Sequence, residues 1–302
     1  MNDAGSGRTL TSTAAALTLV PAGNPGRLVN LSILTSINAA SPQFTVGTVI
    51  GGAGTSGTKP LLVRAAGPAL TTLGVGGVLS DPKLSLFSDQ NTQTPVATND
   101  NWGGSAALST AFASVGAFPY GGATSLDAAT FSETMPAGGY TVQVSGVGGA
   151  TGTVIAELYD ATRAADFTAS TPRLVNVSVL KQIDAGEILT VGFVIGGTTA
   201  KQVLVRAIGP TLAAAPFNVG GAMADPKVSL FSGQTVINAN DNWGGGSLLS
   251  ATGSAVGAFA IGNTASRDAS LLATLAPGSY TVQVSGANSA SGLTLVEVYE
   301  VP

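Results

Sequence analysis

Short runs of alternating apolar and polar residues recur along the chain. Val29, Leu31 and Ile33 alternate with Asn30 and Ser32, for example. A period of two places one face of a β-strand in a core and leaves the other face to solvent. Gly-Gly, Gly-Pro and Asp-Pro pairs separate the runs, as is typical of turns. In the first half of the chain the pattern predicts strands near residues 27–35, 43–50, 60–66, 83–88, 94–98, 126–133, 139–145 and 153–159.

The same series of segments occurs twice. Residues 27–30 recur at 173–176, and residues 140–146 recur unchanged at 280–286. Both tryptophans lie in a repeated Asn-Asp-Asn-Trp-Gly-Gly segment, at 99–104 and 240–245. Such internal similarity predicts two copies of one structural unit. The expected division is an N-terminal segment 1–26, a first repeat 27–160, a linker 161–172 and a second repeat 173–302.

The fold class follows from the number and order of the strands. About eight short strands per repeat, with no helical crossovers, predict an all-β protein of two tandem β-sandwiches of jelly-roll type. An Ala/Ser-rich stretch at 106–116, with its counterpart at 248–257, is expected to hold one short helix. The 41 glycines and the low share of charged residues, 9%, agree with a turn-rich β protein.

Composition also limits the possible functions. The 302 residues include no Cys and no His, which removes disulfides, thiolate zinc sites and a Ser-His-Asp triad. With only 6% aromatic residues, no aromatic-lined substrate cleft is evident, so we expect no enzyme. The net charge of −4 and the absence of a basic cluster argue against a nucleic-acid partner. No apolar run reaches the length of a membrane span.

Charged residues recur at equivalent positions of the two repeats, which favours roles in the fold for several of them. The pairs are Arg27/Arg173, Lys59/Lys201, Arg64/Arg206, Asp81/Asp225, Lys83/Lys227, Asp100/Asp241, Asp127/Asp268, Glu157/Glu297 and Asp160/Glu300.

One group of loop residues offers oxygen ligands of the kind that calcium prefers. The candidates for a calcium site are Asp81, Asn99, Asp100, Asn101 and Asp127 in the first repeat, and Asp225, Asn240, Asp241, Asn242 and Asp268 in the second. EF-hand spacing is absent, so this prediction rests on clustering. The alternative is structural: the Asn-Asp-Asn segment forms an Asx turn and its tryptophan fills the core.

Arg64 and Arg206 lie within apolar strands, and Glu157 and Glu297 lie within the last strand of each repeat. A buried charge is tolerated when it is paired, so we expect a structural Arg–Glu ion pair in each repeat. Two sharper alternatives are an arginine that binds a carboxylate ligand and a carboxylate pair of glycosidase type.

Two family resemblances add to this interpretation. Residues 81–87, Asn99 to Trp102 and residues 139–144 resemble the bacterial pre-peptidase C-terminal domain, a small jelly roll appended to secreted enzymes and often stabilised by calcium. The whole repeat is similar to a tandem module at the C-terminal ends of large secreted bacterial surface proteins. These resemblances imply an extracellular or cell-surface location.

The N-terminal segment carries a further apolar run, which resembles the final strand of a bacterial immunoglobulin-like domain. Its apolar positions are Leu10, Ala14, Ala16, Leu17 and Leu19. A strand outside any sheet has unpaired backbone groups and needs a partner. It could add to its own first repeat or, by strand donation of residues 8–20, to a neighbouring molecule. A frayed or self-docked leader is the plainer alternative.

Together these features favour a non-catalytic structural or adhesive module, such as a filament or surface-layer subunit that associates with itself or with other surface proteins. One alternative is a calcium-dependent carbohydrate-binding module, which requires Trp102 and Trp243 to be exposed. Another is an accessory C-terminal domain of a secreted enzyme.

Overall fold

Each repeat contributes eight β-strands to the fold. The computed structural model describes residues 23–302. The first-repeat strands are β1 (Arg27–Ile37), β2 (Gln43–Gly51), β3 (Thr58–Ala66), β4 (Pro82–Ser88), β5 (Ala97–Asn99), β6 (Ala128–Pro136), β7 (Gly138–Gly146) and β8 (Gly152–Asp160). The second-repeat strands are β9 (Arg173–Ile183), β10 (Leu189–Gly196), β11 (Lys201–Ile208), β12 (Pro226–Ser232), β13 (Thr235–Asn240), β14 (Ala269–Leu275), β15 (Gly278–Gly286) and β16 (Gly292–Glu300).

The helices are few and short. The α-helices are α1 (Ala106–Val115), α2 (Pro210–Ala213) and α3 (Ser247–Ala255), and the 3₁₀ helices are η1 (Pro68–Leu73), η2 (Val147–Gly149) and η3 (Ala287–Ser289). The side chain of Ser105 caps α1 by accepting a hydrogen bond from the backbone N–H of Leu108, and Gly116 ends it in a left-handed conformation. No helix in residues 23–302 has the length and hydropathy needed to cross a membrane.

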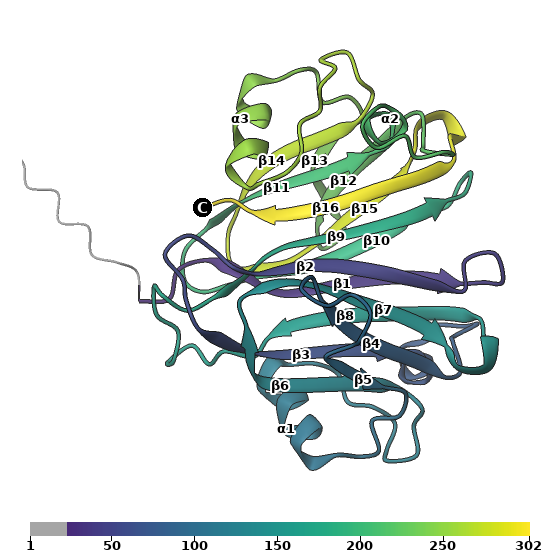
Figure 1. Ribbon diagram of the computed structural model, residues 1–302, viewed down its shortest axis with the longest axis vertical. Coiled ribbons are helices and arrows are strands. Elements are labelled where there is room, and N and C mark those ends of the chain that lie inside the picture. Colours follow the sequence, from purple (N-terminus) through teal and green to yellow (C-terminus); the bar gives the residue numbers. More distant parts are fainter. Residues whose placement is uncertain (1–22) are drawn as a thin grey trace, which may run out of the picture.

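The strands form two stacked layers, and each layer extends through both repeats (Figure 1). One layer has the order β13-β12-β15-β10-β1-β8-β3-β6, and the other has the order β14-β11-β16-β9-β2-β7-β4-β5. Each layer therefore takes four strands from each repeat. A single bridge between Leu28 and Leu174 links the layers into one hydrogen-bonded network.

The repeats meet edge to edge, and they do so reciprocally. Strand β1 pairs with β10, while β9, the counterpart of β1, pairs with β2, the counterpart of β10. Ser32 lies opposite Gly192 in the first junction, and Ser178 lies opposite Gly47 in the second. This is the self-complementary geometry of a two-fold dimer, built here within one chain.

The main core lies between the two layers and is continuous across the junction. It includes Leu31 and Ile33 of β1, Val177 and Val179 of β9, and Phe193 of β10, all of them buried. A second, smaller core lies on the outer face of β3 and β8, under α1. Residues 62, 64 and 66 of β3 face this outer core, whereas residues 61, 63 and 65 face the main core. Both faces of β3 are therefore covered by apolar side chains, which is why almost every residue of the strand is buried.

The structure confirms an all-β sandwich with eight strands and a short helix in each repeat. The sequence did not indicate that the two repeats would share both of their sheets, because periodicity reports the face that a strand buries and not its neighbour. Residues 161–172 run as irregular chain that packs closely on the first repeat, with Phe167 buried. Helices η1 and α2, each with a proline in its first turn after a glycine, were not expected.

Candidate functional site

The Asn-Asp-Asn-Trp segments close the two outer ends of the sandwich. Asn99, the last residue of β5, accepts a hydrogen bond through Oδ1 from the backbone N–H of Ala129 in β6, at 3.0 Å. Asn240 of β13 accepts the equivalent bond from Ser270 of β14, at 2.9 Å. These strands belong to different layers, so each asparagine ties the two sheets together at an edge where no backbone ladder joins them.

The tryptophans are structural. Trp102 is 8% exposed and Trp243 is 7% exposed. The indole N–H of each donates to a backbone carbonyl, of Gly122 for Trp102 and of Asn263 for Trp243, both at 3.0 Å. Trp102 also stacks on Phe112, with ring centroids 5.8 Å apart. Neither ring offers an open face on which a sugar could stack.

Asp127 and Asp268, two of the calcium candidates, anchor the loops that follow β3 and β11. Both are fully buried. Asp127 accepts hydrogen bonds from the backbone N–H groups of Gly67 and Ala69, and Asp268 accepts them from Gly209 and Thr211. Ser125 and Ser266 supply hydroxyl donors to the same carboxylates. Because these donors already surround both oxygens, the geometry describes an anchor for a buried turn.

Asp81 and Asp225, two further calcium candidates, differ in whether a positively charged side chain lies beside the carboxylate. In the first repeat Asp81 has a buried Oδ1 with no hydrogen-bond partner, and burial, followed by the nearby charge of Asp100, raises its pKa. In the second repeat Arg267 Nη1 lies 3.1 Å from Asp225 Oδ2, while Asp225 Oδ1, like Asp81 Oδ1, has no hydrogen-bond partner. Asn101 and Asn242 accept hydrogen bonds through their backbone carbonyls from Asn99 and Asn240, and Asn242 also donates to Asp241. Within the described residues no three acidic side chains converge as a metal site would need.

Arg64 and Glu157 meet as cross-strand neighbours on the outer face of β3 and β8. Arg64 Nε lies 3.4 Å from Glu157 Oε2 and donates to the hydroxyl of Tyr120 at 3.2 Å. The guanidinium carbon of Arg64 also lies 4.3 to 4.4 Å from the ring centroids of Phe112, Phe118 and Tyr120. Cation–π contact thus covers the nitrogens that have no hydrogen-bond partner. Burial raises the pKa of Glu157, and the charge of Arg64 opposes that rise.

The second repeat builds the same pair with fewer aromatic rings around the arginine, and Arg206 Nη1 donates a hydrogen bond to the backbone carbonyl of Phe259 at 2.9 Å. Arg206 Nε lies 3.2 Å from Glu297 Oε2, and the guanidinium faces a single ring, that of Phe259, at 4.5 Å. Gly253 stands where the first repeat has Phe112, and a cavity of about 20 Å³ lies beside Arg206. That volume suits one water molecule and no larger ligand. Neither arginine is therefore placed to bind a carboxylate substrate.

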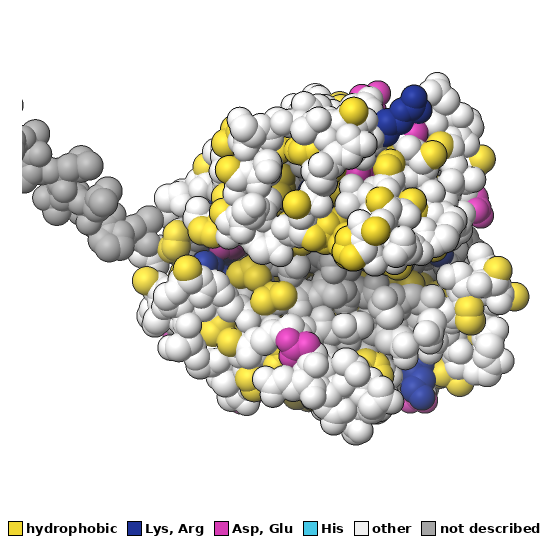
Figure 2. All heavy atoms as spheres, turned by 45° about the horizontal axis from the view of Figure 1, so that its top comes forward, with side chains coloured by type: hydrophobic (Ala, Val, Ile, Leu, Met, Phe, Trp, Pro, Cys, Tyr) yellow, Lys and Arg dark blue, Asp and Glu magenta, His cyan; other side chains and the backbone are white. Residues whose placement is uncertain are grey.

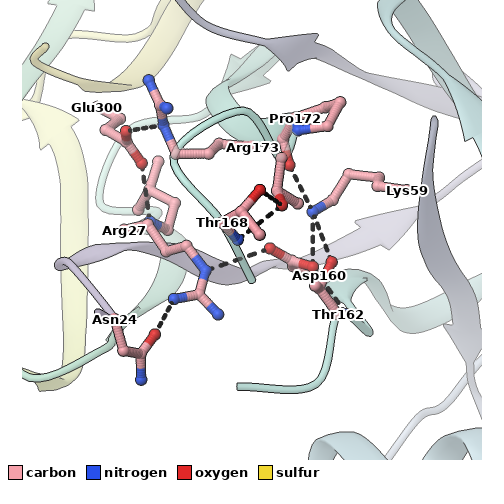
Figure 3. A network of polar contacts seen from close by, with 11 residues as sticks. Asn24, Arg27, Lys59, Asp160, Thr162, Thr168, Pro172, Arg173 and Glu300 are labelled. Atoms are coloured by element: carbon pink, nitrogen blue, oxygen red, sulfur yellow. Dashed lines mark hydrogen bonds and ion pairs between the residues drawn. The ribbon is translucent and has the colours of Figure 1, made fainter. Parts of the chain in front are cut away.

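A second group of repeated charges gathers at the junction of the repeats (Figure 3). Lys59 Nζ lies 2.6 Å from Asp160 Oδ1 and donates to the backbone carbonyl of Pro172 at 3.0 Å. Burial lowers the pKa of Lys59, while the charge of Asp160 opposes that effect. Arg27 Nε lies 3.6 Å from Asp160 Oδ2, and the guanidinium of Arg27 stacks on Phe167 at 3.8 Å. The cluster therefore fastens residues 161–172 to the first repeat.

The equivalent cluster of the second repeat reaches across the junction. Glu300 Oε1 lies 2.7 Å from Arg173 Nε and 3.2 Å from Lys201 Nζ. Its other oxygen accepts a hydrogen bond from the backbone N–H of Leu28, in the first repeat, at 3.1 Å. The sequence showed that these charged residues recur in both repeats. It gave no signal that they would meet, because the three residues of each cluster lie on three different strands.

An open groove of about 930 Å³ lies beside α1 and the start of residues 161–172. Its charged lining has mixed sign, with Arg27 and Arg163 opposite Asp160, Asp166 and Glu133. Arg27 and Asp160 are already paired with each other. The groove thus presents no concentration of one charge that would select a ligand.

The outer edges of the layers are the other sites where the fold leaves backbone groups unpaired. Within the described chain, β5, β6, β13 and β14 each pair with one strand only. Charged side chains are sparse on the face shown in Figure 2, in keeping with the composition. The two ends of the sandwich differ, however. Val236 and Ile237 of β13 are 50% and 45% exposed, whereas the shorter edge strand β5 follows Pro95.

The proposed donor residues Leu10, Ala14, Ala16, Leu17 and Leu19 lie outside the described residues. The chain that follows them is fixed to the second repeat, because Asn24 accepts hydrogen bonds from the backbone N–H and the hydroxyl of Thr198. A comparison with models of known protein families and with curated proteins finds no match to this chain.

Proposed function

We propose that this protein is a non-catalytic structural or adhesive module that works outside the cell and assembles with copies of itself by donating its N-terminal strand. The observation that carries the proposal is the reciprocal junction of the two repeats. Within one chain, this fold already joins two units by pairing free strand edges, through β1 with β10 and β2 with β9. The outer edge strands offer the same mode of association to another molecule.

The placement of the charged side chains supports a structural role. The repeated Arg–Glu pairs, the junction clusters and the buried aspartates all hold strands, loops or repeats together. Groups held in this way stabilise one rigid shape, which is what a building block requires. The burial of Trp102 and Trp243 does not favour the carbohydrate-binding alternative, which needs an exposed aromatic face.

The test compares the full chain with a variant that carries Leu17→Asp and Leu19→Asp, and with a chain that lacks residues 1–22. Negative-stain electron microscopy and light scattering over a range of protein concentrations report the assembly. We expect the full chain to form extended assemblies and both variants to remain single molecules. Equal melting temperatures would show that the sandwich itself is intact. Assembly by all three proteins, or by none, would overturn the proposal.

A further inference from the structure

The two ends of the sandwich carry different protection against strand addition. At the first-repeat end, Pro95 precedes β5, and β6 carries the exposed Glu133 at a β-bulge opposite β3. Proline, charge and bulges are the devices by which proteins protect edge strands from pairing. The second repeat has neither the proline nor the charge at the equivalent positions: Val236 stands in place of Pro95, and Thr274 stands in place of Glu133. Strand β13 has a bulge of its own against β12, between Val236 and Asn238, so the bulge does not distinguish the two ends.

Strand β13 is the more receptive of the two unprotected edges. It forms a two-residue hairpin with β12, in which Ser232 pairs with Thr235 and Phe231 pairs with Val236. The pair that flanks a two-residue loop is hydrogen-bonded, and the next pair is not, so the N–H and C=O of Val236 point to the free edge. Val236 and Ile237 are also exposed apolar side chains, whereas Leu271 and Leu275 of β14 are buried.

We propose that β13 is the acceptor edge and that its occupant is the N-terminal strand, residues 8–20, of a second copy of this chain. This inference rests on the proposed function and names its docking surface. The added strand would extend the layer beyond β13, pair with Thr235 to Ile237, and cover the apolar side chains there with Leu17 and Leu19 of the partner copy.

The length of the chain decides whether the strand can reach β13 of its own molecule. Asn24 is held at the end of β10, and an added strand beyond β13 lies four strand spacings from β10, or about 19 Å. Val20 precedes Asn24 by four residues, which span at most about 14 Å. The full predicted strand therefore cannot lie along β13 of its own chain. A donor on one site and an acceptor on a different site give a head-to-tail contact, which extends into a filament when the rotation does not close.

Matched substitutions at the two ends test this assignment. Ile237→Lys places a charge on β13, and Val96→Lys places one at the equivalent exposed position of the first repeat. Val236→Pro introduces the residue that the first repeat carries as Pro95, so the fold has a precedent for it. Thr274→Glu recreates Glu133 on β14. Melting temperatures and tryptophan fluorescence verify that each full-length variant is folded.

We expect Ile237→Lys and Val236→Pro to raise the concentration needed for assembly by roughly tenfold or more, equivalent to about 1.4 kcal/mol. Val96→Lys and Thr274→Glu should assemble as the unmodified chain does.

If Ile237→Lys and Val236→Pro assemble normally while Leu17→Asp/Leu19→Asp does not, strand donation stands but β13 is not its acceptor. Inhibition by Thr274→Glu alone would assign the acceptor to β14, and equal inhibition by Val96→Lys would refute the difference between the ends. Assembly by every variant overturns both proposals.

Discussion

The two repeats bury charge at equivalent positions, with different neighbours around those charges, and they differ further where they meet solvent at the ends of the sheets. Both carry an Arg–Glu pair, a buried aspartate anchor and an Asn-Trp closure, in equivalent geometry. The first repeat protects its outer edge with Pro95 and Glu133, whereas the second presents Val236 and Thr274. Buried networks constrain several residues at once, because loss of one partner leaves the others unsatisfied. Edge positions have no such internal constraint, so their difference is the better guide to association.

The largest expected effect is at the Arg–Glu pairs. Arg64→Met leaves the buried carboxylate of Glu157 without its partner and should lower the free energy of unfolding by about 3–5 kcal/mol at pH 8. Arg206→Met should cost less, because Arg206 contacts one aromatic ring where Arg64 contacts three. Urea denaturation measures both. Equal losses would show that the aromatic rings around Arg64 add nothing.

The same pair gives a pH dependence with a definite sign. Burial raises the pKa of Glu157 in the folded state, and loss of Arg64 removes the charge that opposes that rise. A carboxyl with a raised folded-state pKa destabilises the fold when it is ionised, so stability increases as the pH falls through that pKa. The loss caused by Arg64→Met should therefore shrink between pH 8 and pH 5. As a control, Arg64→Met combined with Glu157→Leu should recover much of the stability at pH 8.

A smaller loss of stability is expected at the junction, where the cluster around Glu300 should differ from the cluster around Asp160. Glu300→Asp shortens the side chain that accepts from Leu28 of the first repeat, which should cost about 1.5–3 kcal/mol, the usual value of a hydrogen bond to a charged group. The control is Asp160→Asn, which leaves that cross-repeat bond in place. Hydrogen exchange at the β1–β10 pairing should accelerate in Glu300→Asp and not in Asp160→Asn. Unchanged exchange in Glu300→Asp would refute the role of Glu300 across the junction.

The smallest effect concerns Asp81 and its counterpart Asp225. Because the pKa of Asp81 is raised, its ionised form disfavours the fold, and Asp81→Asn should raise the melting temperature at pH 7 by about 1 °C or less. The gain should vanish as the pH falls through the raised pKa. Asp225→Asn should give no gain in melting temperature, because Arg267 compensates that charge.

The same melting measurements with millimolar calcium test the metal prediction. A calcium site at Asp81 requires that calcium raise the melting temperature and that Asp81→Asn abolish this rise.

The alternation of apolar residues was sufficient to predict the sandwich. The predicted strand at 27–35 corresponds to β1, and the Ala/Ser-rich stretch at 106–116 corresponds to α1. Side-chain period carries this information because it reports which face is buried. The period does not report which strand edges pair with each other. The β1–β10 and β2–β9 junctions could therefore be found only from the structure.

The candidate site residues show the same limit. Arg64 and Glu157 could be paired from their burial alone, since an apolar strand must neutralise its charges. Asp127 could not be distinguished from a metal ligand, because the backbone N–H groups that bind it come from residues 67 and 69, far away in sequence. The sequence shows that Val236 replaces Pro95 in the second repeat. Only the structure shows that both positions lie at outer edges of the sheets, where proline hinders strand addition.

The absence of cysteine allows a direct test of the donated strand. Chains with Leu17→Cys are mixed with chains carrying Val236→Cys, allowed to assemble, and treated with a flexible bis-maleimide that spans a few residues of register. We predict a two-chain cross-linked product in this mixture and none when Val96→Cys replaces Val236→Cys. Assemblies that yield no Leu17–Val236 product, or yield as much with Val96→Cys, would contradict strand donation to β13.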